Sequence, residues 1–325
     1  MVDSGAIDVS PQYQRRDRWS SDSQAALIES FLLNVPVPPV YLAEDDFGTY
    51  SVIDGKQRIT AIRAFMRNNL VLQDISKFKE VRDLTFESLP KPLQNALSIR
   101  PYVRVVTLLK QTDPQLKYEV FTRLNTGGEP LNPQEIRNAL YRGGFNDLLF
   151  ELGENAFLCQ QLKIKTKKET PYSQMQDVET VLRFLSLSDG WETFDGDMRL
   201  SLDMYASFYQ KANKSKLSSM KSRFDTAISR CEDLWGVQAF RRFEKGVVRD
   251  QFMSAMYDAQ MISASELTDA QFKKISKKKI ELQKSFLVLF KDATFVDSIR
   301  VSTNSPSKVL YRVRKVKELL SKFAK

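Results

Sequence analysis

The chain has 325 residues, of which 42% are hydrophobic and 27% charged, so it is long enough for two globular domains. Its net charge of +9 favours polyanionic partners, nucleic acid first, although a solvated Lys-rich surface explains the same charge. The absence of histidine excludes Ser–His and Cys–His nucleophile pairs, imidazole-ligated zinc and an HNH nuclease within this sequence.

The first part of the chain alternates helix and strand signals. Residues 20–33 open with a Ser/Asp cluster that can cap a helix, and a Pro-rich connector over 35–40 follows. Residues 40–44 and 49–54 are predicted strands joined by a hairpin turn. Apolar residues then recur at helical spacing from Gln57. The order strand, tight turn, helix places Asp54–Arg58 at the start of a helix.

The next part mixes short elements. The pattern predicts a helix pair interrupted by prolines over 86–97, a strand over 99–108, a helix over 114–124 and a glycine-containing loop over 126–130. A helix follows, with Asn132 as its cap, Pro133 at its first position and Glu135 completing a capping box.

From Phe145 the character of the sequence changes to helical throughout. We therefore expect an α+β fold with a domain boundary near residue 144, an α/β domain over 1–144 and an α-helical domain over 145–325. The helices expected in the second domain cover 145–162, 174–187, 198–212, 216–234, 247–262, 268–291 and 306–324.

The run from Asp54 to Arg58 has the composition of a phosphate site. Backbone amides at a helix start attract phosphate oxygens, and Gly55 lets the backbone approach a ligand closely. Lys56 or Arg58 can neutralise phosphate charge. Asp54 can hold Mg²⁺, and Gln57 can position a water. A simple Asp-Gly turn that ends a strand explains the same residues.

Two further motifs would indicate a binding site only if they fold against the first. One is Tyr13-Gln14-Arg15 followed by Trp19, which is also an ordinary pattern for a surface arginine. The other runs from Phe121 to Gly128. It contains Asn125, which could hydrogen-bond a base or a metal-bound water, but a helix C-cap followed by an N-cap accounts for it equally well.

Taken in order, the strings YQR–W, VIDGKQRITAI and FTRLNTGGEPLNPQEIRNALY resemble the N-terminal domain of GmrSD-type restriction endonucleases, whose strings are close to YQR..W, IDGQQRLTTL and F.RLN..G..L...EIRN. The resemblance covers residues 11–142 well and the later helices loosely. It implies a ParB/sulfiredoxin-like small mixed sheet with packed helices. It also implies a nucleotide-fuelled sensor of modified DNA that controls an HNH nuclease in phage defence.

The resemblance implies a set of site residues. Those expected to be catalytic are Asp54, Gln57 and Arg58, with Asp54 also the metal ligand. Those expected to contact the nucleotide are Arg15, Gly55, Lys56, Thr60, Arg123 and Asn125. The chain departs from the family pattern at Lys56, where the usual residue is Gln. Lysine can serve a phosphate as a point charge but cannot donate and accept as an amide does.

The implied cofactors are a nucleoside triphosphate (GTP, ATP or CTP) and Mg²⁺, so Mg-dependent hydrolysis is one activity that the pattern allows. The implied partners are DNA, including modified phage DNA, a separate nuclease or defence-system subunit, and a second copy of the chain. No apolar run reaches the roughly 20 residues of a membrane helix, and the first residues lack the apolar core of a secretory signal. We therefore expect a cytoplasmic protein.

Two other functions stay open at this point. A non-enzymatic DNA-binding or protein-interaction scaffold would use basic helices, including Lys273, Lys274, Lys277, Lys278, Arg312 and Arg314. A sulfiredoxin-like reductase would need a reactive cysteine beside the phosphate loop. Cys159 and Cys231 both lie far from that loop in the sequence, which argues against the reductase.

Overall fold

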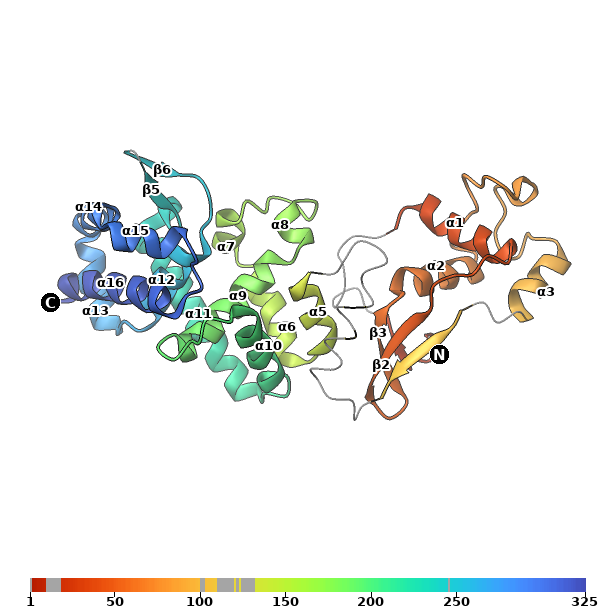
Figure 1. The fold of residues 1–325 in the computed structure, drawn as a ribbon, viewed down its shortest axis with the longest axis horizontal. Helices are drawn as coiled ribbons and strands as arrows, with labels where there is room; N and C mark the ends of the chain where they lie inside the picture. The colour runs from red at the N-terminus through yellow and green to blue at the C-terminus, as the bar shows by residue number, and fades with distance from the viewer. Residues whose placement is uncertain are drawn as a thin grey trace. The chain divides into compact units, whose positions relative to one another are not determined.

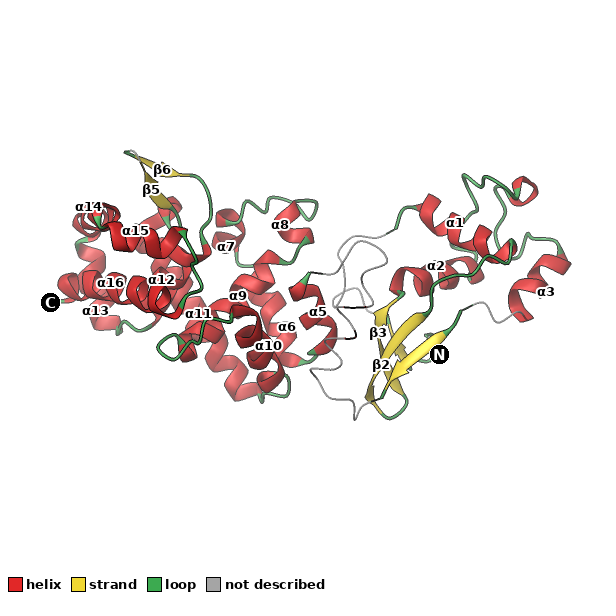
Figure 2. Ribbon diagram, in the orientation of Figure 1, coloured by secondary structure: helices red, strands yellow, loops and turns green. Residues whose placement is uncertain are grey.

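The computed structural model describes residues 2–9, 19–99, 103–109, 120, 123, 132–244 and 246–325. The chain divides into two compact units, Met1–Leu140 and Tyr141–Lys325. The first contains a small mixed sheet with helices, and the second is largely helical (Figures 1 and 2). The predicted α+β class, with a helical C-terminal part, is confirmed.

The sheet of the first unit is built around a hairpin. Strands β2 (Val40–Asp46) and β3 (Thr49–Asp54) pair antiparallel, β1 (Ile7–Asp8) adds in parallel to β3, and β4 (Val105–Leu108) adds in parallel to β2. The resulting order is β1-β3-β2-β4. The predicted hairpin is confirmed, whereas β1 was not predicted because two residues are too few to show alternation.

Helices cover both faces of this sheet. Successive side chains of a strand point to opposite faces of the sheet. Residues of β2 and β3 therefore contribute to an apolar cluster on each face. On one face the core contains Val40, Leu42 and Val52, with Ile59 of α2 (Lys56–Met66) packed against it. On the other face it contains Ala43 and Ile53 with Ile136 and Ala139 of α5 (Pro133–Leu140). The start of α2 is thereby fixed beside the end of β3.

A second apolar cluster joins α2 to α1 (Ser21–Leu32). The Ser20 hydroxyl caps α1 by accepting a hydrogen bond from the Ser23 amide at 3.2 Å, as the sequence predicted. Phe31 of α1 and Phe65 of α2 lie in the same buried cluster. The chain continues through a short 3₁₀ turn at Lys79–Val81 and α3 (Lys91–Ile99), which also contacts α1.

The second unit is organised around α12 (Ser254–Ser265), whose residues 255–264 are all buried. Helix α12 contacts α9 (Gln176–Gly190), α11 (Lys214–Trp235) and α16 (Pro306–Ala324). The remaining helices are α6 (Gly144–Gly153), α7 (Ala156–Gln161), α8 (Thr170–Ser173), α10 (Met198–Tyr209), α13 (Asp269–Lys277), α14 (Lys279–Val288) and α15 (Ala293–Arg300). A small hairpin, β5 (Arg242–Glu244) and β6 (Val247–Arg249), completes the unit.

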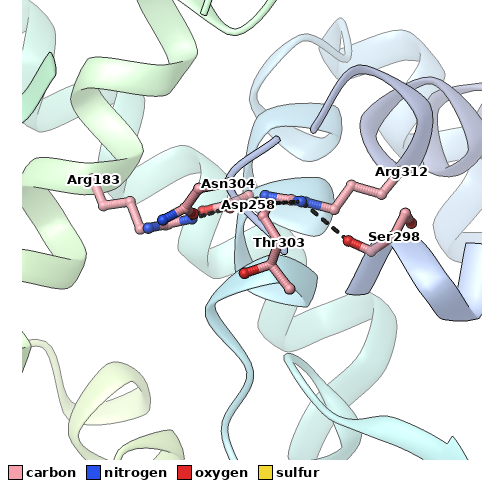
Figure 3. Close-up of polar contacts among 6 residues, drawn as sticks. All are labelled: Arg183, Asp258, Ser298, Thr303, Asn304 and Arg312. Atoms are coloured by element: carbon pink, nitrogen blue, oxygen red, sulfur yellow. Dashed lines mark hydrogen bonds and ion pairs between the residues drawn. The ribbon is translucent and has the colours of Figure 1, made fainter. Parts of the chain in front are cut away.

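A buried charge cluster ties three of these helices together (Figure 3). The Asp258 carboxylate of α12 accepts two hydrogen bonds of 2.7 Å from the Arg183 guanidinium of α9 and one of 2.6 Å from Arg312 of α16. Arg312 also donates to the carbonyls of Ser298 and Thr303. The scaffold hypothesis placed Arg312 on a phosphate-binding surface. That assignment is wrong, because Arg312 is fully buried in this cluster.

Several predicted helices are shorter than expected. The helix predicted over 145–162 is split because the Asn155 side chain caps a new helix by accepting from the Leu158 amide at 3.0 Å. The helix over 268–291 is interrupted at Lys278, and the one over 247–262 begins only at Ser254, after β6. In each case the apolar residues keep their helical spacing in the sequence although the helix itself is interrupted or starts later. Spacing alone therefore predicts a helix that is too long.

Candidate functional site

The motif from Asp54 to Arg58 lies at a strand–turn–helix junction, as predicted. Asp54 is the last residue of β3, and Gly55 is the N-cap of α2 with φ +95°. A Cβ atom on Gly55 would lie 2.8 Å from Cγ2 of Val40. Glycine is therefore needed here both for the left-handed backbone and for the close approach of β2. Gly55 has no side chain, so the N-cap residue itself does not cap α2.

Arg58 connects the three segments that meet at this junction. Its Nη2 donates to Oδ2 of Asp54 at 2.5 Å and to the Pro39 carbonyl at 3.1 Å. The Arg58 side chain is only 13% exposed and that of Asp54 33% exposed. Its Nε is buried and has no acceptor within the described part of the chain. The guanidinium thus closes the junction and retains one unsatisfied donor, which favours an anionic ligand.

Gln57 links the junction to Trp19 of the second motif. Its Oε1 accepts from the Trp19 amide at 3.4 Å, and Nε2 of Gln24 donates to the Trp19 carbonyl at 3.0 Å. Trp19 also packs against the cluster between α1 and α2. The structure therefore brings one residue of the second motif, Trp19, to the first. Tyr13, Gln14 and Arg15 lie outside the described residues.

Four other residues were expected to contact a nucleotide, and the structure describes three of them. Lys56 is half-buried in the first turn of α2, and Thr60 is exposed one turn further. Arg123 is exposed, and Asn125 lies outside the described residues. Pro39 and Val40, which shape the junction, were not identified from the sequence. The Pro-rich connector was visible, but its convergence on Arg58 depends on sheet pairing.

The residues that follow the third motif fix the start of α5 (Pro133–Leu140). The Asn132 side chain accepts from the Glu135 amide at 2.9 Å, and the Glu135 carboxylate accepts from the Asn132 amide at 2.7 Å, which confirms the predicted capping box. Arg137 is buried on α5 and donates to the Gln134 side chain at 3.2 Å. These residues hold α5 in place, and Arg137 does not face solvent.

Asp54 alone does not make a metal site at this junction, so Mg²⁺ would need further ligands from outside the protein. Within the described ranges no group of three or more Asp, Glu, Cys or His side chains could enclose a metal ion. Mg²⁺ is commonly held by one or two carboxylates together with substrate phosphates and waters. Asp54 can supply one such carboxylate, so the residues fit a metal ion that arrives with a triphosphate.

The cysteines belong to a different unit from this junction and lie far from it in the sequence. Cys159 and Cys231 are both reduced and belong to the second unit, whereas Asp54–Arg58 belongs to the first. Burial raises the pKa of Cys231 well above its usual value, which suppresses the reactive thiolate. The first unit thus contains no cysteine that could react beside Asp54–Arg58.

The role of Gly55 can be separated from that of an ordinary turn glycine. Gly48, in the β2–β3 turn, has φ +77°, but a Cβ atom added to it would have no described neighbour within 4 Å. We expect Gly48→Ala to lower the free energy of unfolding by about 1–2 kcal/mol through backbone strain alone. Gly55→Ala should cost more, about 2–4 kcal/mol, because the contact with Val40 adds to the strain. Denaturant unfolding of both variants measures the difference, and equal losses would contradict the close-approach argument.

Comparison with known families gives one match. Residues 1–142 match the family described as GmrSD restriction endonuclease, N-terminal domain. No curated protein and no solved structure gives a significant match to the chain. Among the described residues, no helix combines the length and apolar character needed to cross a bilayer.

Proposed function

We propose, from the premise that residues 1–142 are a GmrSD restriction endonuclease N-terminal domain, that the chain is a nucleotide-binding regulatory module of a DNA restriction and phage-defence system. The observation that supports this most is the junction at Gly55. A helix N-terminus, an N-cap glycine with positive φ and a partly buried guanidinium with one unsatisfied donor occur together there. These are the features that a triphosphate uses.

In the proposed bound state, phosphate oxygens accept hydrogen bonds from the first backbone amides of α2 and from Arg58. In this proposal the contact between Arg58 and Asp54 belongs to the nucleotide-free state. Phosphate displaces Asp54 from Arg58, because both anions compete for the same guanidinium. Release of Asp54 makes its carboxylate available to Mg²⁺ carried by the nucleotide. Lys56 adds positive charge in the first turn of α2.

Hydrolysis needs an additional feature, a positioned water. Gln57 is the group proposed to orient it, since its side chain lies at the same helix start and is held near the Trp19 amide. Bound Mg²⁺ would neutralise charge that develops on the phosphates. The residues of this chain would bind and orient the triphosphate around that ion.

Turnover of GTP, ATP and CTP with Mg²⁺ tests this function. We expect Asp54→Ala to lower the rate with the preferred nucleotide by about 100-fold, as expected when several kcal/mol of metal-assisted charge stabilisation are lost. The matched control is Arg63→Ala, which removes an exposed arginine of the same helix that pairs with Asp3. Equal rates in wild type and the Asp54 variant would place the site elsewhere.

A second observation favours direct contact with DNA. Lys273, Lys277 and Arg314 are exposed, and the helices that carry them, α13 and α16, contact each other. Lys274 of α13 and Lys278, between α13 and α14, are exposed as well. Lysine and arginine on one part of a surface bind a phosphate backbone through counterion release. We propose that these helices contribute to DNA affinity, without the buried Arg312.

Salt dependence of DNA affinity tests this contact. Lys273→Glu/Lys277→Glu should weaken binding and make the slope of log K against log salt less steep by roughly 2 units, about 0.9 per lost phosphate contact. Lys165→Glu/Lys167→Glu makes the same charge change at exposed residues between α7 and α8 and serves as the control. The contact is refuted when both pairs change the slope equally.

A further inference from the structure

A small pocket in the second unit is lined by three side chains that each carry a buried, unsatisfied hydrogen-bond donor. It lies where the end of α11 meets the β5–β6 hairpin and α14, and its lining includes Trp235, Arg241 and Arg242. Trp235 is 3% exposed and Arg241 5% exposed. The space open to the centre of a water-sized sphere is only about 10 Å³. That is near the smallest space in which a single water or ion can be held.

All three side chains leave one buried donor without a partner in the described part of the chain. The atoms are Nε1 of Trp235, Nη1 of Arg241 and Nε of Arg242. Nη2 of Arg242 pairs with Glu244 at 3.2 Å. Nη2 of Arg241 donates to the Gln161 carbonyl at 2.9 Å. Leaving such donors unsatisfied is costly, more so for charged groups, and three in one pocket point to a missing acceptor.

The charges and walls of the pocket indicate what this acceptor is. Arg241 lies 3.4 Å from Asp250, and Arg242 lies 3.2 Å from Glu244, but Lys163 also pairs with Asp250, and Arg249 and Arg300 with Glu244. These seven side chains carry five positive and two negative charges. Rings of Phe243, Phe286 and Phe290 line the pocket, and aromatic edges are electropositive.

Burial lowers the pKa of Arg241, and the nearby Asp250 only partly opposes this effect. An anion in the pocket would stabilise the charged guanidinium further.

A water molecule satisfies the pocket less well, because it accepts two hydrogen bonds and must place two protons of its own. A chloride ion, or one oxygen of a phosphate group, accepts from all three donors without donating any.

We propose that this pocket is a binding site for a small anionic acceptor, either a chloride ion or a single oxygen of an oxyanion such as phosphate. The site is independent of the nucleotide site proposed above, since its residues all belong to the second unit. Occupation would satisfy three buried donors at once and fix the β5–β6 hairpin to α11 and α14.

Thermal unfolding of the full chain tests the site. Sodium chloride and sodium phosphate are titrated at matched ionic strength, and the same titrations of the Trp235→Phe variant give the baseline for the general effect of salt. We expect Tm to rise by about 3–5 °C at tenfold excess over Kd with chloride, with phosphate or with both, and to keep rising with the logarithm of the salt concentration. The effective salt identifies the source of the acceptor. Trp235→Phe, which removes one donor, should abolish or reduce the rise. Trp191→Phe is the matched control, because its indole Nε1 donates to Glu266 instead.

Crystals of the wild-type chain grown in sodium bromide give a second measurement that does not depend on the variants folding. An anomalous bromide peak within hydrogen-bond distance of Trp235 Nε1 and Arg241 Nη1 is the expected result for a chloride site. Phosphate density at the same donors is expected if phosphate alone raises Tm. A water at that position in every salt, with no salt-specific rise in Tm, would overturn the proposal.

Discussion

Replacing Asp258 by Asn is expected to lower the free energy of unfolding of the second unit by about 3–5 kcal/mol, because it leaves two buried guanidinium groups without their counter-charge. Arg312 is fully buried, and Arg183 is 13% exposed. Both point toward Asp258 in Figure 3. Denaturant unfolding of the full chain measures the loss. Asp297→Asn, an exposed carboxylate paired with Lys308 on neighbouring helices, is the control and should change stability by less than about 1 kcal/mol.

The same cluster predicts a pH dependence. Burial alone would raise the pKa of Asp258, but Arg183 and Arg312 outweigh burial and hold this pKa below its usual value. Its folded-state pKa is therefore depressed, so the contribution of Asp258 is complete above the unfolded-state pKa, near 4, and is lost as pH falls through the lower folded-state pKa. The stability difference between wild type and Asp258→Asn should shrink only on that acid side. A difference that shrinks between pH 6 and 8 would contradict this assignment.

Replacing Arg58 by Ala is expected to weaken nucleotide binding by about 10- to 100-fold, because a hydrogen bond to a charged group contributes roughly 1.5–3 kcal/mol. Arg58→Lys keeps the charge but loses the planar fork, so its affinity should lie between those of wild type and Arg58→Ala. Calorimetric titration with each nucleotide and Mg²⁺ gives the affinities.

Arg58 also holds the Pro39 carbonyl, so loss of binding must be separated from loss of structure. Melting curves of each variant identify unfolding, and Arg63→Ala again controls for removal of a positive charge from α2. Nucleotide affinity that is unchanged in a folded Arg58→Ala variant would mean that the arginine only closes the junction. The proposal that phosphate displaces Asp54 from Arg58 would then be wrong.

The junction was predictable because its determinants are local. An alternating strand, an Asp-Gly pair and helical spacing from Gln57 are all read within about 20 residues, and the structure places them as predicted. The capping box at Asn132 and Glu135 is equally local and was confirmed. In both cases the residues that fix the backbone are within four positions of one another.

What could not be predicted depends on residues far apart in the sequence. The partner of Arg58 at Pro39 is 19 positions away and is reached only through the pairing of β2 with β3. Arg312 has the spacing of a surface residue in a basic helix, yet its partner Asp258 is 54 positions away and draws it into the core. The donors around Trp235 likewise meet only when the β5–β6 hairpin folds against α11 and α14.

The central claim is that a triphosphate binds at the start of α2, and a crystal structure with a non-hydrolysable nucleotide and Mg²⁺ tests it most directly. The account predicts phosphate oxygens about 2.7–3.2 Å from the amides that follow Gly55 and from the Arg58 guanidinium, with Asp54 released from Arg58. A nucleotide bound elsewhere, or Arg58 still closed on Asp54 and Pro39 at saturating nucleotide, would contradict it.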